Sequence, residues 1–314
     1  MSLLENSALF RVQVCRREES RGRILGAGLA NSKGEADRGD YLNLQRYNSL
    51  ALAAIILLSL LVAGCCCGNL ENSQSSGPER FKRAALNAVC DLQTVIPLAG
   101  ACVFAIDDFD EKVSDWASKH NPIFGSENAA RDFSDLTAGA LGLEALLTAV
   151  TTVSGVDPND RVRSKQNALC VEGLAFAATY SVTDVLKDET RRTRPDGDDR
   201  SFPSGHSSYA FSLATIANRN LDYKSIHLGP IHLQDNWRRP LQVLNLGAAT
   251  GVAWARVEGR KHYPSDVLFG AGLGHCLTAF VHDYFIHDLD EGDRFRLLIC
   301  PCKRGAMVEL TFYF

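Results

Sequence analysis

The chain has 314 residues, of which 46% are hydrophobic, and a formal net charge of −4 at pH 7. This length gives ample material for a buried core, and the slight negative charge argues against nucleic acid as a partner. The ten cysteines show no spacing typical of zinc sites, so we expect no metal and no other cofactor. No feature of the sequence determines the oligomeric state or any pairing of the cysteines.

Residues 1–41 are polar and charged without a sustained apolar period, which predicts a disordered extension. An uncharged apolar run follows at residues 50–62, and Arg46 stands just before it. The run is short for a membrane span, which needs about 20 residues, and fits the apolar core of a signal peptide. The polar, serine-rich stretch that follows is typical of a flexible linker.

The end of this apolar run, Leu61-Val62-Ala63-Gly64-Cys65, resembles the lipobox of bacterial lipoproteins. In that motif, cleavage before the cysteine leaves its thiol to carry lipid. The resemblance predicts a signal peptide at 42–64, lipidation of Cys65 and a linker at 65–80; a short membrane anchor with incidental cysteines is the alternative. Because a signal peptide should open a chain, our hypothesis is that translation begins near Leu42.

Helical periodicity dominates residues 81–290, and no stretch there alternates with period two. We predict an all-α domain built as a multi-helix bundle. The predicted helices cover 82–106 (with a kink at Pro97), 108–118, 129–153, 163–187, 206–218, 240–256 and 264–286.

Two of these segments, 129–153 and 163–187, are long and apolar enough to raise the question of membrane spans. Glu144 and Glu172 lie in their middles, however, and carboxylates inside a membrane are costly. The sequence therefore favours a water-soluble bundle. In residues 291–314, apolar residues alternate on both sides of a glycine-containing turn, which predicts a C-terminal β-hairpin or a tail packed on the bundle.

The first of three polar clusters contains Lys187 and, after six residues, Arg194-Pro195. Arginine offers a planar fork to phosphate oxygens, and lysine offers a point charge. Two cations near a helix end are, by themselves, most often a solvated face that counters the helix dipole. This cluster therefore indicates a phosphate site only when it is considered together with the other two clusters.

The second cluster is Pro203-Ser204-Gly205-His206, which leads directly into a predicted helix. Free backbone N–H groups, the Ser204 hydroxyl and the helix dipole meet there, and together they favour an anion. Gly205 permits close approach of the backbone to a ligand. His206, on the first turn, is placed to give a proton to a leaving oxygen.

The third cluster contains Arg256, His262 and Asp266. A carboxylate bonded to one ring nitrogen of a histidine fixes the tautomer and leaves the other nitrogen as a nucleophile. Arg256 adds a third cation. Taken alone, a His-x-x-x-Asp pair most often means a surface histidine and a capping aspartate.

In order and spacing, the three clusters resemble the signature of the type 2 phosphatidic acid phosphatase superfamily, which includes bacterial acid phosphatases and vanadium haloperoxidases. That signature reads Lys-x6-Arg-Pro, then Pro-Ser-Gly-His, then Ser-Arg-x5-His-x3-Asp, and Ala255 stands where it usually has serine. The resemblance implies the helical bundle of that superfamily, with His262 as nucleophile, Asp266 as its orienting group and His206 as proton donor. It assigns phosphate binding to Lys187, Arg194, Ser204, Gly205 and Arg256.

The resemblance implies a metal-independent hydrolase of phosphate monoesters or pyrophosphates, acting through a phosphohistidine with a bell-shaped pH dependence. With the lipobox, it predicts an enzyme anchored in the bacterial cell envelope, in the outer membrane and facing the periplasm, with lipid phosphates or small phosphoesters as substrates. Two alternatives remain. One is a vanadium-dependent haloperoxidase, and the other is a non-catalytic lipoprotein that binds phospholipid.

Overall fold

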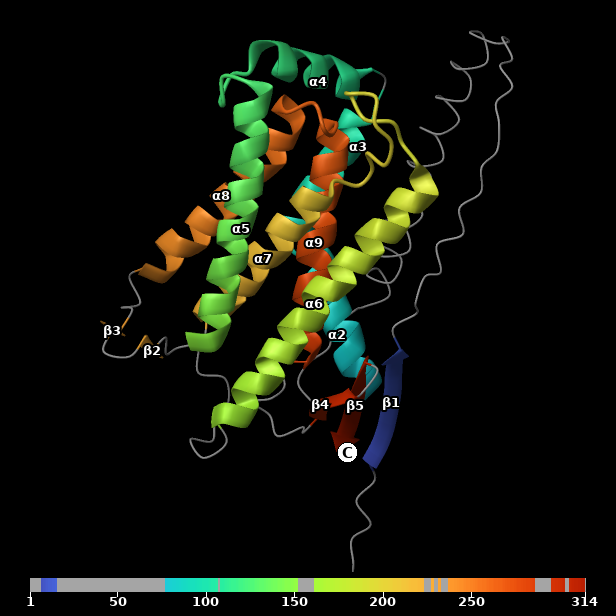
Figure 1. Cartoon of the computed structure of the whole chain (residues 1–314), viewed down its shortest axis with the longest axis vertical. Coiled ribbons are helices and arrows are strands. Elements are labelled where there is room, and N and C mark those ends of the chain that lie inside the picture. Colours follow the sequence, from blue (N-terminus) through green and yellow to red (C-terminus); the bar gives the residue numbers. More distant parts are fainter. Residues whose placement is uncertain are drawn as a thin grey trace, which may run out of the picture. The chain divides into compact units, whose positions relative to one another are not determined.

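The computed structural model describes residues 7–15, 77–106, 108–151, 161–222, 227–228, 231–232, 237–285, 295–302 and 305–313. It divides into a helical unit, Leu44–His287, and a second unit made of Met1–Asn43 and Asp288–Phe314. The helices of the first unit are α2 (Gly77–Cys90), α3 (Leu92–Phe104), α4 (Phe109–His120), α5 (Glu127–Thr151), α6 (Arg161–Thr190), α7 (Gly205–Asp222), α8 (Arg238–Glu258) and α9 (Pro264–Phe285). The predicted all-α bundle is confirmed (Figure 1).

Helices α7 and α9 lie at the centre of the bundle and α4 lies across one end of it (Figure 1). The largest core cluster joins Phe211 of α7, Val252 of α8 and Val267 of α9, and alanines fill much of the remaining interface. Two glycines of α9 let α7 approach closely. A Cβ atom at Gly274 would lie 2.1 Å from the carbonyl oxygen of Ser208, so only glycine fits.

The first predicted helix is divided into α2 and α3, which meet at an angle of 53°. The break is at Asp91, whose carboxylate accepts a hydrogen bond from the backbone N–H of Gln93 at 2.9 Å and so caps α3. Pro97 lies inside α3. The predicted kink at Pro97 was therefore misplaced, because a capping aspartate starts a new helix earlier in the segment.

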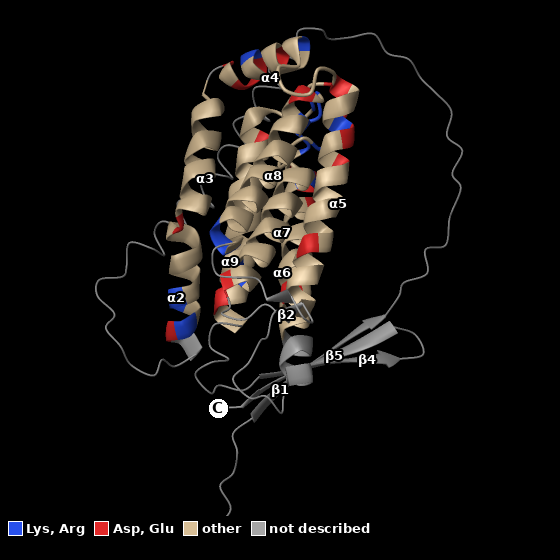
Figure 2. Cartoon of the chain, turned by 90° about the vertical axis from the view of Figure 1, so that its left-hand side faces the viewer, with Lys and Arg blue, Asp and Glu red and all other residues tan. Residues whose placement is uncertain are grey.

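Helices α5 and α6 are each long and apolar enough to cross a membrane, and the bent pair α2–α3 is a third candidate. Large apolar side chains of α5, such as Leu136 and Leu143, point outward with 77% and 59% of their surface exposed. The charged residues of α5 gather mainly at the end near α4 (Figure 2). An exposed apolar face over a core of small residues is the pattern expected of a helix in lipid.

The prediction of a water-soluble bundle has to be corrected, because α5 and α6 are long and apolar enough to cross a membrane. It rested on Glu144, which is half-buried in the structure, and on Glu172, which is only 6% exposed. The carboxyl group of Glu172 faces the side-chain amide of Asn220 on α7. A carboxyl group that points into the bundle does not have to enter lipid, so Glu172 is no obstacle to a membrane span.

The second unit contains a three-stranded antiparallel sheet in the order β1 (Ser7–Cys15), β5 (Gly305–Tyr313), β4 (Phe295–Cys302). Strands β4 and β5 lie at the position of the predicted hairpin, with Phe295 opposite Phe312. The prediction of a disordered extension does not hold for β1, where apolar and polar residues alternate with period two. Within the helical unit, β2 (His227–Leu228) and β3 (Ile231–His232) form a short antiparallel pair.

Candidate active site

The three sequence clusters meet at the end of the bundle that α4 covers. The backbone N–H of Ser204, just before α7, donates to the carbonyl oxygen of Asp266 at 3.0 Å. A Cβ atom at Gly205 would lie 3.5 Å from Cε of Lys187, near the end of α6. The loop after α8 folds back so that the N–H of His262 donates to the carbonyl oxygen of Arg256 at 3.2 Å. Residues up to 79 positions apart thus form one site.

His262 lies in the short loop between α8 and α9 and is 1% exposed. Its Nδ1 atom is 2.7 Å from the carbonyl oxygen of Ser201. A carbonyl oxygen only accepts hydrogen bonds, so Nδ1 carries the proton and Nε2 keeps a lone pair. The tautomer required of a nucleophile is therefore set by a backbone group.

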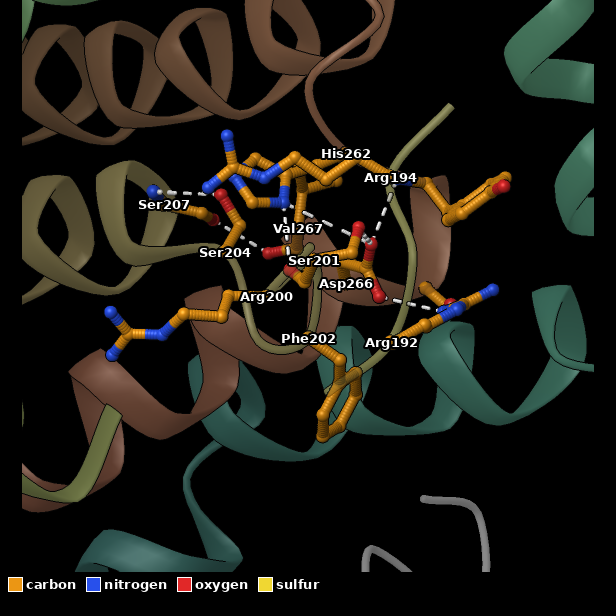
Figure 3. Close-up of polar contacts among 12 residues, drawn as sticks. Arg192, Arg194, Arg200, Ser201, Phe202, Ser204, Ser207, His262, Asp266 and Val267 are labelled. Atoms are coloured by element: carbon orange, nitrogen blue, oxygen red, sulfur yellow. Dashed lines mark hydrogen bonds and ion pairs between the residues drawn. The ribbon is translucent and has the colours of Figure 1, made fainter. Parts of the chain in front are cut away.

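Asp266 lies close to His262 but does not bond to it directly, because its Oδ2 is 3.9 Å from Nδ1. The expectation that this carboxylate bonds to the ring is corrected: its hydrogen bonds go elsewhere. Ser201 donates from Oγ at 2.5 Å, the N–H of Tyr263 donates at 2.9 Å, and Arg192 donates at 2.6 Å. Figure 3 shows Ser201 and Asp266 beside the ring, with Arg192 on the far side of the carboxylate.

The electrostatics of the site keep Asp266 charged and His262 neutral. Burial raises the pKa of Asp266, but Arg192, with further contributions from His262 and Ser201, holds it at about 2. Burial lowers the pKa of His262 to about 4, against the opposing effect of Asp266. Lys187 and Arg256 lower the pKa of His262 further. At neutral pH the ring is therefore unprotonated and its Nε2 can act as a nucleophile.

The three predicted cations lie in this part of the bundle, and Lys187 and Arg256 act on the ring of His262. Lys187 donates to the carbonyl oxygen of Arg200 at 3.2 Å. Arg194 makes a long ion pair with Asp198 at 3.8 Å, and Arg256 donates to Ser134 at 3.1 Å. The Nε atoms of Arg194 and Arg256 are buried and have no hydrogen-bond partner among the described residues. Such donors suit a bound oxyanion.

The start of α7 supplies uncharged donors to the same space. Ser204 is fully buried and caps the helix, accepting from the N–H of Ser207 at 3.4 Å. Gly205 opens the helix, and a Cβ atom there would lie in ordinary contact with Tyr209 at 3.4 Å and Lys187 at 3.5 Å. The helix N-terminus with its glycine therefore allows an anion to approach the backbone closely.

His206 is the most exposed of the predicted catalytic side chains, at 38%. Its Nε2 lies 3.0 Å from Oδ1 of Asp135 on α5, and the same oxygen is 3.6 Å from Arg256. Burial and Arg256 lower the pKa of His206, while Asp135 opposes them. His206 thus stands at the open side of the site with a carboxylate that favours its protonated form.

Several residues of the site were not found from the sequence. Asp135 lies 71 positions before His206, and nothing in the sequence links the two. Ser201 lies between the first two motifs, and Arg192 occupies a variable position inside the first, where the run Arg191-Arg192-Thr193-Arg194 could have drawn attention. The predicted lipidation residue Cys65 lies outside the described residues.

Comparisons with known proteins agree with this geometry. A family model described as the PAP2 superfamily matches residues 190–287. A protein named lipid A 1-phosphatase from Porphyromonas gingivalis is 29% identical over 145 residues, which are 46% of this chain and 29% of that protein. The chain thus matches less than a third of the length of this curated relative.

A solved structure that partly matches the chain is titled as the first transmembrane PAP2 type phosphatidylglycerolphosphate phosphatase from Bacillus subtilis. It has a TM-score of 0.46 and 23% sequence identity, and the match covers 60% of this chain and 92% of that one. The family model on residues 190–287 covers the second and third clusters and Arg194 of the first, and all three clusters meet in one site. The part of the chain that carries most of the site is thus similar to the PAP2 superfamily.

Proposed function

We propose that the chain is a phosphatase that hydrolyses phosphate monoesters or pyrophosphates of lipids through a phosphohistidine at His262. The observation that carries the proposal is the 2.7 Å contact between Nδ1 of His262 and the carbonyl oxygen of Ser201. It directs the lone pair of Nε2 away from the protein backbone. Lys187 and Arg256 both act on the ring, so a phosphoryl group held by these cations would lie within reach of the nucleophile.

In the first step, Nε2 of His262 attacks phosphorus and the bond from phosphorus to the leaving oxygen breaks. Lys187, Arg194 and Arg256 stabilise the charge on the equatorial phosphoryl oxygens. His206 gives its proton to the leaving oxygen, so the alcohol or phosphate departs in a protonated form. The step requires a neutral His262 and a protonated His206.

In the second step, a water molecule attacks the phosphohistidine and the bond from phosphorus to Nε2 breaks. His206, now neutral, takes a proton from the attacking water. Inorganic phosphate leaves, and both histidines return to their starting protonation states. Asp266 stabilises the positive charge that His262 carries while it is phosphorylated.

A lipid phosphate is the substrate class we favour, and two observations support it. The site lies at one end of a bundle whose helices α5 and α6 could cross a membrane. The curated relative from Porphyromonas gingivalis is named for a lipid phosphate, the 1-phosphate of lipid A. A membrane-embedded enzyme with its site at the bilayer surface meets a headgroup phosphate without extracting the lipid.

The test is phosphate release by the full-length protein in liposomes, with lipid A, phosphatidic acid and undecaprenyl pyrophosphate as lipid substrates and p-nitrophenyl phosphate as soluble control. We expect faster release from a lipid, inhibition by vanadate, and a phosphoprotein trapped with 32P-labelled substrate that is absent in His262→Ala. Halide oxidation with added vanadate, without phosphate release, would overturn the proposal in favour of a haloperoxidase. Binding of lipid phosphate without turnover would overturn it in favour of a binding protein.

We further propose that lipid on Cys65 anchors the chain to the envelope on the periplasmic side. The lipobox-like sequence Leu61–Cys65 supports this proposal. Mass spectrometry of the mature protein from bacterial cells should find a diacylglyceryl group at Cys65, which Cys65→Ser abolishes. Peptides that span residues 60–70 without modification would contradict it.

A further inference from the structure

An arginine at a variable position of the first motif contacts the carboxylate of Asp266. Arg192 donates from Nη1 to Asp266 Oδ1 at 2.6 Å and to Oγ of Ser265 at 2.8 Å. Its guanidinium stacks over the ring of Tyr263, 4.3 Å from the centroid. The Arg192 side chain is only 14% exposed. A charge so deeply buried is costly unless it is paired, and here Asp266 is one of its partners.

The second partner of Arg192 comes from α4, the helix that lies across this end of the bundle. Nη2 of Arg192 donates to Oδ2 of Asp110 at 2.8 Å. Asp110 also accepts from the N–H and the hydroxyl of Ser265, on the first turn of α9. It therefore holds both Arg192 and the helix start that carries Asp266. The side chain of Asp110 is 5% exposed, so water does not replace these bonds.

The charges that face His262 come from several elements. Asp266 lies on α9, Lys187 on α6 and Arg256 on α8, and all three act on the ring. Arg192 and Asp110 lie behind Asp266, on the side away from the ring. In the proposed function Lys187 and Arg256 bind the phosphate, whereas Arg192 remains bound to Asp266. Arg192 is therefore the cation available to keep Asp266 ionised throughout the reaction.

We propose that Arg192, anchored by Asp110, is a positioning residue that holds Asp266 ionised beside the nucleophile His262. The proposal rests on the proposed function, because His262 has no nucleophilic role otherwise. Arg192 touches neither the substrate nor the attacking nitrogen. Its effect reaches the reaction through the proton affinity of the His262–Asp266 pair.

The charges determine whether removal of Arg192 raises or lowers the pH at which the His262–Asp266 pair takes up a proton. Arg192 favours the ionised carboxylate, so its removal lets the His262–Asp266 pair take up its first proton at higher pH. Whichever partner accepts that proton, the reactive form with neutral ring and ionised carboxylate is lost. The acidic limb of kcat/KM should therefore move upward by about one pH unit in Arg192→Met.

Two further variants separate charge from structure. Arg192→Lys keeps the positive charge but loses the planar fork, so we expect a lower kcat with the acidic limb within a few tenths of a unit of the unmodified protein. Arg191→Gln is the matched control, since the Arg191 side chain is exposed and donates to the nearby carbonyl oxygen of Asp188. It should leave the profile unchanged. Equal profiles for Arg192→Met and Arg192→Lys would overturn the proposal.

A double-mutant cycle tests the anchoring role of Asp110. If Asp110 acts through Arg192, Asp110→Asn should lower kcat/KM in the unmodified background by about tenfold and have little effect beside Arg192→Met. Multiplicative losses in the double variant would overturn the anchoring role and leave Arg192 acting alone.

A titration that needs no turnover keeps this proposal distinct from the proposed function. The full chain carries eight histidines, and 13C labelling of their rings gives signals of which His262 is assigned by its loss in His262→Gln. The His262 signal of Arg192→Met should titrate at a higher pH than that of the unmodified protein. An unshifted midpoint overturns the role of Arg192. Absence of phosphate release in the unmodified protein overturns the proposed function and leaves the titration valid.

Discussion

Ser201 contacts both His262 and Asp266, the proposed catalytic pair, and its backbone carbonyl oxygen accepts the Nδ1 proton of His262 at 2.7 Å. Its hydroxyl donates to Oδ2 of Asp266 at 2.5 Å. The first contact comes from the backbone and survives any substitution of the side chain, whereas the second requires the hydroxyl. One residue therefore separates the two tasks that the motif assigns to Asp266 alone: setting the tautomer and supplying charge.

This division predicts a mild defect for Ser201→Ala. The tautomer of His262 persists, and one of the hydrogen bonds to Asp266 is lost. A bond to a charged group is worth about 1.5–3 kcal/mol, so kcat should fall by roughly 10-fold to 100-fold. Phosphate release at saturating substrate measures the effect. His262→Ala sets the lower reference, and a Ser201→Ala variant as inactive as His262→Ala would contradict the division.

Asp135 should control the basic limb of the pH profile. Its carboxylate lies 3.0 Å from Nε2 of His206 and favours the protonated ring. In Asp135→Asn this support is lost, so the pKa of His206 falls and the proton donor is deprotonated at lower pH. The basic limb of kcat/KM should move down by about one unit. The acidic limb, which depends on the His262–Asp266 pair, should stay near its original position.

The matched control is Asp132→Asn, which removes an equal charge from the exposed surface of the same helix. It should leave both limbs in place, because within the part of the chain that the structure describes no hydrogen bond or ion pair joins Asp132 to His206 or His262. If Asp132→Asn moves the basic limb as far as Asp135→Asn does, the effect is one of overall charge and not of the contact with His206.

The motif residues could be predicted from the sequence because each has a required neighbour at a fixed spacing. Ser204 and Gly205 must be adjacent at a helix start. His262 must lie in the loop just before a helix, and Asp266 must lie on the first turn of that helix. Asp110 could not be found in this way, since it reaches Ser265 from 155 positions away. Its role depends on how α4 lies over the bundle, which no local pattern records.

The helices were predicted more completely than the medium, water or lipid, that surrounds them. Helical periodicity located α4 to α9 because each helix buries a regular face. It could not decide between water and lipid, since Glu172 counts as a charge in the sequence whether it points inward or outward. Only the packing of α6 against α7 places Glu172 at 6% exposure. Exposed leucines on α5 then become a face for lipid.

That face makes a substitution test possible. Leu143, in the middle of α5, is 59% exposed, and a lysine there would place a charge in the hydrocarbon region. On insertion scales a central charge costs about 2.5–3.5 kcal/mol. We expect Leu143→Lys to reduce the fraction of protein that resists alkaline extraction from membranes, while Leu143→Phe leaves it unchanged. Equal extraction of both variants would indicate that α5 does not lie in lipid.

The close contact between α7 and α9 predicts a stability defect for Gly274→Ala. A Cβ atom there would lie 2.1 Å from the carbonyl oxygen of Ser208 and 2.9 Å from its carbonyl carbon. Both are backbone atoms, so relief requires the helices to separate, at a cost of about 1–3 kcal/mol. Because Ser204, one turn before Ser208, caps α7 in the active site, the separation should also lower kcat/KM.

Gly247→Ala is the matched control for this change. Gly247 lies on α8, and a Cβ atom there has nothing within 4 Å. The same methyl group should therefore stabilise the helix by about 0.4–1 kcal/mol by restricting the unfolded chain. Thermal unfolding in detergent should give a lower Tm for Gly274→Ala and an equal or higher Tm for Gly247→Ala. If the Tm of both variants changed in the same direction, helix propensity, and not the contact between α7 and α9, would decide the outcome.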